Sequence, residues 1–160
     1  MLNIYKSYIR PILEYGSIVW NMGYIGDLCL LERVQRRLTR AIAGLETLPY
    51  SRRLKILNLF SLKGRLLRND LIYVWKIFQG LTPISPESLF ILNDSGATRG
   101  HSYKIFTPRC NLDIRKRFFS VRIIAHWNAL SNGTVNSDNL HTFKRLLQDD
   151  LGDILFEYVE

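Results

Sequence analysis

The chain has 160 residues, 47% of them hydrophobic and 22% charged, and its net charge at pH 7 is +8. This apolar content is enough to bury a core, which excludes a chain that is disordered over most of its length. The positive charge favours an acidic partner, such as nucleic acid, an anionic membrane surface or an acidic protein. No apolar run approaches the roughly 20 residues of a membrane-spanning helix, so we expect no membrane partner.

The first part of the chain predicts helices. Apolar residues recur at helical spacing from Leu2 to Tyr15, and Pro11 predicts a kink or a new helix start there. The pattern is cleaner from Gly26 to Leu45, where Asp27 is the expected N-cap. We expect an apolar stripe of this second helix to face the core, with the arginines on the opposite side. The stripe consists of Leu31, Val34, Leu38, Ala41, Ile42 and Leu45.

Residues 49–80 predict two more helices. The first runs from Pro49 to Leu57, and the second runs from Leu62 to Gln79 with Gly80 as its C-terminal stop. Apolar residues recur at helical spacing in the second of these helices, so we expect them in the core. These core residues are Leu67, Leu71, Val74, Trp75 and Phe78.

Residues 81–112 contain prolines, glycines and asparagines and predict a linker. Within it, the alternation of Tyr103 and Ile105 indicates a short strand or an extended arm. A helix is then expected from Asp113, its N-cap, to Leu130, and a last helix from Leu140 to Leu151. The expected fold is therefore mainly α: a small helical bundle (residues 1–80), an extended or short β arm (81–112) and a second helical unit (113–160).

No set of residues in the sequence indicates a catalytic centre. The cysteines, Cys29 and Cys110, lie far apart, which fits a reducing, intracellular compartment. Asp149 and Asp150 end a predicted helix, whereas the metal-binding aspartates of polymerases lie on a β-hairpin. Three histidines lack a cysteine or carboxylate at metal-ligand spacing: His101, His126 and His141. We therefore expect no metal, no cofactor and no enzymatic activity of the chain on its own.

Positive charge is concentrated in two runs, a pattern that favours nucleic-acid contact over a solvated helix face. The first run lies on the helix from Gly26 to Leu45 and consists of Arg33, Arg36, Arg37 and Arg40. Arginine binds phosphate through two parallel hydrogen bonds and keeps its charge at any relevant pH. Aromatic residues are interleaved with the second run, which suits a groove that binds the backbone and stacks bases. The second run consists of Arg99, Lys104, Arg109, Arg115, Lys116, Arg117 and Arg122, and we expect His101 to join the contact surface that this run forms.

Several segments, in order along nearly the whole chain, resemble the region after the palm in reverse transcriptases of non-LTR, LINE-type (jockey-like) retrotransposons. They are Tyr5–Tyr15 with Trp20, Leu31–Arg37, Asp70–Ile77, Arg99–Ser102, Arg115–Arg122, Trp127–Asn128 and Phe143–Lys144. The segment Leu62–Leu67 departs from the more acidic and arginine-rich version of that family, and the chain carries no CCHC zinc knuckle.

The resemblance implies the thumb and C-terminal segment of an RNA-directed DNA polymerase whose catalytic aspartates and endonuclease lie upstream. The expected partners are RNA, an RNA–DNA hybrid or a DNA backbone, together with the palm and fingers of the parent polymerase. The expected location is the nucleus or a cytoplasmic ribonucleoprotein. On this interpretation, replacing Arg36, Arg37 and Arg40 with glutamate abolishes binding without loss of helix. Two alternatives remain open: a helical protein-interaction adaptor with an acidic partner, and a functionless relic of a truncated element.

Overall fold

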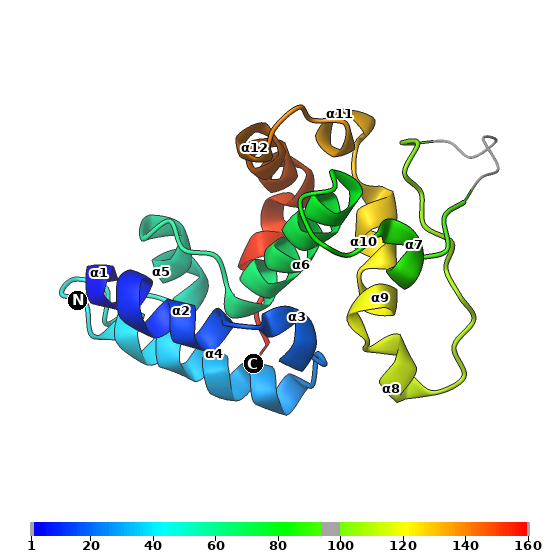
Figure 1. Ribbon diagram of the computed structural model, residues 1–160. Coiled ribbons are helices and arrows are strands. Elements are labelled where there is room, and N and C mark those ends of the chain that lie inside the picture. Colours follow the sequence, from blue (N-terminus) through cyan, green and yellow to red (C-terminus); the bar gives the residue numbers. More distant parts are fainter. Residues whose placement is uncertain (1, 94–99, 160) are drawn as a thin grey trace. The chain divides into compact units, whose positions relative to one another are not determined.

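The computed structural model describes residues 2–93 and 100–159 of the chain (Figure 1). These residues form helices joined by loops, so the expected mainly α fold is confirmed. The chain folds into two compact units. Unit 1 comprises Met1–Leu66 and Asp153–Glu160, and unit 2 comprises Leu67–Gly152. The division into residues 1–80, 81–112 and 113–160 rests on composition and stays a prediction.

Unit 1 begins with a helical stretch that contains a π-helical turn. The stretch consists of α1 (Leu2–Ile4), the π-helix η1 (Tyr5–Ile9) and α2 (Arg10–Glu14). Pro11 lies in the first turn of α2, and Ile9 and Arg10 before it are also in the right-handed helical conformation. The helix therefore does not start afresh at Pro11, and the departure from α-helical geometry is the π-helical turn just before it. The remaining helices of unit 1 are α3 (Ser17–Trp20), α4 (Ile25–Arg40) and α5 (Tyr50–Ile56).

The helix α4 corrects two expectations. Tyr24 is the N-cap, so Asp27 lies in the first turn, where its carboxylate stabilises the positive end of the helix dipole. The expected apolar stripe is borne out only in part: Leu31 packs on a core cluster and Leu45 is buried, but Leu45 lies beyond the end of the helix and Val34 is 38% exposed. The residues of α4 that are buried are Leu28, Glu32, Gln35 and Thr39. Three of these four are polar, and their hydrogen-bond partners include residues from distant parts of the chain.

The long helix α6 (Leu62–Phe78) begins in unit 1 and supplies the core of unit 2. Gly80, with φ +65°, follows its end in the left-handed conformation that commonly terminates helices. Leu71, Val74 and Trp75 are buried as expected. Trp75 stacks on Phe143, with 5.2 Å between the ring centroids. Leu67 and Phe78 are only half-buried, and Ile72 and Ile77 on other sides of α6 are buried too, so the predicted face is one part of what α6 buries.

The prediction of one continuous helix from Asp113 to Leu130 is wrong. The segment forms three short helices, α8 (Asp113–Lys116), α9 (Phe119–Arg122) and α10 (Ile124–Ala129). Phe118 is extended, with φ −63° and ψ 144°, and Leu112 rather than Asp113 occupies the N-cap position. The break lets Arg122 donate both to the Arg117 carbonyl and to the Asp70 carboxylate of α6.

The expected β arm is also corrected. Among the described residues there is no strand, and Leu92 and Ile105 form a single antiparallel bridge. The side-chain amide of Asn128 takes the other edge of Ile105, accepting from its N–H at 3.0 Å and donating to its carbonyl at 2.7 Å. A side chain from α10 therefore replaces the second strand that a ladder would need.

Three further helices complete the part of unit 2 that the structure describes, and the last one confirms a prediction. They are α7 (Pro86–Leu89), α11 (Asn132–Val135) and α12 (Leu140–Leu151). The 3₁₀-helix η2 (Gly152–Phe156) follows α12 and from Asp153 on belongs to unit 1. The Asn139 side chain caps α12 by accepting from the Thr142 N–H at 2.9 Å. Phe143 and Leu147 of α12 are fully buried.

Candidate nucleic-acid interface

A buried network of polar side chains fixes the orientation of α4 in unit 1. Gln35 donates to the Tyr50 hydroxyl at 2.9 Å and accepts from the Tyr5 hydroxyl at 2.7 Å. The carboxylate of Glu32, only 2% exposed, accepts from the Tyr50 hydroxyl and from the Leu62 N–H at 2.7 Å. Burial and the Glu32 charge raise the pKa of Tyr50 far above its ordinary value, so its hydroxyl stays protonated and donates.

Arg65, only 2% exposed, supplies the positive charge at the centre of this network. Its guanidinium donates to Gln35 and to the Phe60 carbonyl, each at 2.6 Å, and to the Tyr5 hydroxyl at 3.2 Å. Its Nε donates to Glu14, which also pairs with Arg10. Buried charges are tolerated only when they are paired and hydrogen-bonded, a condition that this network meets.

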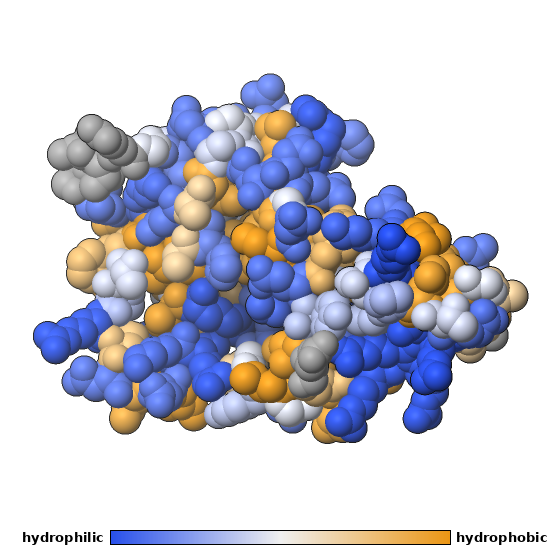
Figure 2. Space-filling view, turned by 180° about the vertical axis from the view of Figure 1, so that it is seen from behind, coloured by the Kyte–Doolittle hydropathy of each residue, from blue (hydrophilic) through white to orange (hydrophobic). Residues whose placement is uncertain are grey.

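Because Glu32 and Gln35 face inward, the opposite side of α4 faces solvent. At about 100° per residue, Arg33, Arg37 and Arg40 fall together on that outer side. All three are exposed, and none pairs with a carboxylate among the described residues. Figure 2 shows one face of the molecule, on which hydrophilic side chains predominate and hydrophobic ones form smaller patches between them. The outer side of α4 therefore carries uncompensated positive charge, as expected from its sequence.

Arg36, the fourth arginine of the first run, binds groups of unit 1 itself. Its guanidinium carbon is 5.0 Å from the Tyr50 ring centroid and 4.8 Å from that of Tyr158. It also donates to the Val159 carbonyl at 3.0 Å. Arg36 therefore holds the C-terminal segment against α4 through cation–π contacts and a hydrogen bond. Its contact with nucleic acid stays a prediction.

Arg53 of α5 adds to the positive field near α4. It is 6% exposed and donates to the Arg36 carbonyl and to the Thr39 hydroxyl. Burial lowers the pKa of Arg53, and the neighbouring charges of Arg40 and Arg36 lower it further. Arg52, the preceding residue, is exposed. Arg53 therefore lies near the positive charges of Arg36 and Arg40.

Some side chains of the second basic run are exposed, and others bind groups of the protein itself. Arg109, Arg115 and Lys116 are exposed, and Lys116 pairs with Asp113 at 2.8 Å. Lys104 donates to the Asn128 carbonyl. Arg99 lies outside the described residues. The structure does not gather this run on one helix face, as it does Arg33, Arg37 and Arg40.

Two residues of the contact surface expected around the second run are buried or nearly so and bind protein groups. Arg122 forms a two-pronged ion pair with Asp70, with N–O distances of 2.9 and 3.1 Å. His101 is 2% exposed, and its Nε2 donates to the Trp127 carbonyl at 3.0 Å. The structure gives both residues a role inside unit 2, and their contact with nucleic acid stays a prediction.

The burial of His101 makes unit 2 sensitive to acid. Burial lowers the pKa of His101 from its ordinary value, and the nearby Lys104 charge acts in the same direction. The neutral ring is therefore favoured in the folded state. Neutral His101 stabilises the folded state fully at pH values above the ordinary histidine pKa, and this stabilisation is lost as pH falls through the lowered pKa of the folded state. The wild-type chain should lose more stability between about pH 7.5 and about pH 5 than His101→Gln does. Thermal unfolding at the two pH values measures this, with His141→Gln, an exposed site on α12, as the control. Equal pH dependence in the wild type and His101→Gln would contradict it.

The described residues offer no other obvious site. They contain no group of three histidine, cysteine or acidic side chains placed to hold a metal ion. No helix in the same ranges is long and apolar enough to cross a membrane. Sequence reasoning missed the polar network under α4, although Glu32, Gln35 and Thr39 follow Leu28 at helical spacing and so share its face.

No protein-family model, no curated protein and no solved structure matches this chain. The resemblance to non-LTR reverse transcriptases therefore rests on the short motifs of the sequence.

Proposed function

We propose that the chain binds the phosphate backbone of nucleic acid through the outer side of α4, and that it has no catalytic role of its own. The observation that carries the proposal is the row Arg33, Arg37 and Arg40, exposed and without a carboxylate partner among the described residues. Positions 33, 37 and 40 are spaced by four and three residues, so their guanidinium groups lie along one side of the helix. A row of cations on a rigid helix matches a polyanion better than a single small anion.

The polar network supports this proposal because it makes α4 a rigid support. Glu32, Gln35 and Arg65 hold the helix by its inner face, which fixes the direction of the arginines on the other side. Contacts between these arginines and phosphates would position a nucleic-acid backbone without reading the bases. The arginine row and the motif resemblance together favour one interpretation of the chain. It is a thumb-like segment of a non-LTR RNA-directed DNA polymerase that holds a template–primer duplex or the element's RNA.

A charge-matched pair of triple variants tests the proposal. Replacing Arg33, Arg37 and Arg40 with glutamine should weaken binding to an RNA–DNA hybrid and lower the salt dependence. On duplex DNA, the slope of log affinity against log salt should fall by about 0.9 for each phosphate that the variant no longer neutralises. Fluorescence anisotropy across a salt series measures both quantities. Arg36 is left unchanged because its substitution would also release the C-terminal segment.

The control replaces Lys6, Lys55 and Lys63 with glutamine, which removes the same charge from exposed positions of unit 1. Lys55 and Lys63 pair with Asp153 and Glu157, so their loss should change the salt slope little. If the two triple variants show equal losses of affinity and equal decreases in the salt slope, binding depends only on net charge, and α4 is not the binding surface.

A further inference from the structure

The outer face of α4 has an apolar part that phosphate binding does not explain. Leu30 is 59% exposed and Val34 is 38% exposed, beside the row of arginines. These two residues, Leu38 and Ala41 lie on the solvent side of the helix, next to Arg33 and Arg37. Exposed apolar side chains that gather on one surface commonly mark a binding site.

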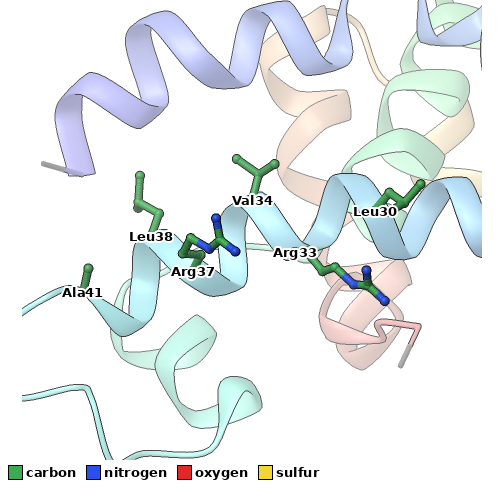
Figure 3. Close-up of a pocket in the computed structure, with 6 residues that line it drawn as sticks. All are labelled: Leu30, Arg33, Val34, Arg37, Leu38 and Ala41. Carbon is green, nitrogen blue, oxygen red and sulfur yellow. The ribbon is translucent and has the colours of Figure 1, made fainter.

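The side chains of α4 form a groove between two ridges (Figure 3). One ridge, Leu30, Val34 and Leu38, is apolar, and the other consists of Arg33, Arg37 and Ala41. Residues spaced by four along a helix form such ridges, and a second helix packs its own ridge into the groove between them. The geometry therefore fits a helix better than an extended strand or a small molecule.

The charge of the groove selects among possible helices. A second copy of this chain would bring its own Arg33 and Arg37 against those of the first, and each chain carries a net charge of +8. Two such faces repel one another. A helix that carries acidic side chains beside an apolar ridge would instead pair with both arginines while it buries Leu30 and Val34.

We infer that this groove docks an acidic amphipathic helix of a partner protein. The helix places an apolar ridge, with residues four apart, between the two ridges of α4, and its aspartate or glutamate side chains pair with Arg33 and Arg37. Arg40 does not line the groove and remains available to other anions. This inference goes beyond nucleic-acid binding and does not depend on it, although Arg33 and Arg37 belong to both surfaces.

Selection from a displayed peptide library tests the inference on the full chain. The peptides are about 20 residues long, enough to form a helix in water, with the outward positions randomised. Binding is then measured to three variants: Leu30→Ser with Val34→Ser, Arg33→Gln with Arg37→Gln, and Arg40→Gln as the control. The serine pair keeps the charge, and both of its positions are exposed, so the variant should stay folded, which circular dichroism checks.

The expected outcome is enrichment of peptides with apolar residues four apart flanked by aspartate or glutamate. Their affinity should fall about tenfold or more in the serine pair and in the glutamine pair, and little in Arg40→Gln. The serine pair should leave affinity for an RNA–DNA hybrid unchanged, which separates this test from that of nucleic-acid binding. No enrichment, or enriched peptides that bind the serine pair as well as the wild type, overturns the inference. If no peptides are enriched and the serine pair instead loses binding to the hybrid, or to anionic phospholipid vesicles, the apolar ridge serves another ligand. That result also overturns the inference.

Discussion

Replacing Arg65 with methionine should destabilise unit 1 by about 3–5 kcal/mol, because it removes one partner from a buried set of charges. Arg65 donates to Glu14, Gln35, Tyr5 and the Phe60 carbonyl. Methionine fills much of the same volume but donates nothing, so each of these acceptors loses one hydrogen bond, and the charge that balances Glu14 is reduced to Arg10. Hydrogen exchange of the α4 and α5 amides measures the free energy of unfolding of unit 1 separately from unit 2.

Arg10→Met is the matched control for Arg65→Met. Arg10 pairs with the same Glu14 carboxylate at 2.9 Å, but its side chain is 34% exposed, against 2% for Arg65. A partly exposed pair four residues apart on one helix contributes about 0.5 kcal/mol. If both variants lose the same small amount of stability, the network does not hold α4 and does not fix the direction of its outer face.

Gly64→Ala should destabilise unit 1 by about 3 kcal/mol, although alanine ordinarily stabilises a helix relative to glycine. A Cβ at Gly64 would lie 2.4 Å from the carbonyl oxygen of Leu155 and 2.7 Å from its Cα. These are backbone atoms of the C-terminal segment, and Ser61 binds the same Leu155 carbonyl from its N–H at 3.0 Å. The segment must therefore move away from α6, which exposes Leu155, now 1% exposed.

Gly26→Ala provides the comparison for Gly64→Ala. Gly26 lies in α4, and a Cβ there would meet nothing within 4 Å. This control should gain up to about 1 kcal/mol from better helix propensity. Limited proteolysis of the segment after Gly152 should be faster in Gly64→Ala alone. Equal stability and equal proteolysis in the two variants would show that Leu155 does not pack against α6.

The helices whose buried face is apolar were predictable from the sequence. In α12, the expected bounds of Leu140 and Leu151 are those observed, because Asn139 caps the helix and Phe143 and Leu147 mark its inner face. The helix α5 and part of the buried face of α6 followed for the same reason. In each of these helices, local pattern and tertiary burial agree, so a single periodicity determines both.

The inner face of α4 was not predictable by counting apolar residues. Glu32 and Gln35 are buried because Tyr5, Tyr50 and Arg65, all distant in sequence, complete their hydrogen bonds. A polar residue is expected to face solvent unless such partners are known. The exposure of Arg33, Arg37 and Arg40 was nevertheless expected correctly. These arginines lie on the outer side of α4 whether the buried face is the expected apolar stripe or the observed, mostly polar one.

Unit 2 shows the same limit of local patterns. The apolar periodicity from Asp113 to Leu130 predicted one helix, but Arg122 pairs with Asp70 and the chain bends at Phe118. The second basic run, together with His101, predicted a contact surface, whereas burial against Trp127 and Asp70 gives His101 and Arg122 protein partners. Charge in a sequence locates a basic surface only when no partner inside the fold takes up that charge.

Binding of a nucleic-acid backbone, the central claim, is tested most directly by a salt series. The wild-type chain is titrated against a labelled RNA–DNA hybrid, single-stranded RNA and duplex DNA, with fluorescence anisotropy as the readout. We predict binding that weakens steeply with salt, and a preference for the hybrid if the chain is a thumb-like segment. Absence of binding to all three by a folded chain, or binding that salt does not weaken, would contradict the claim.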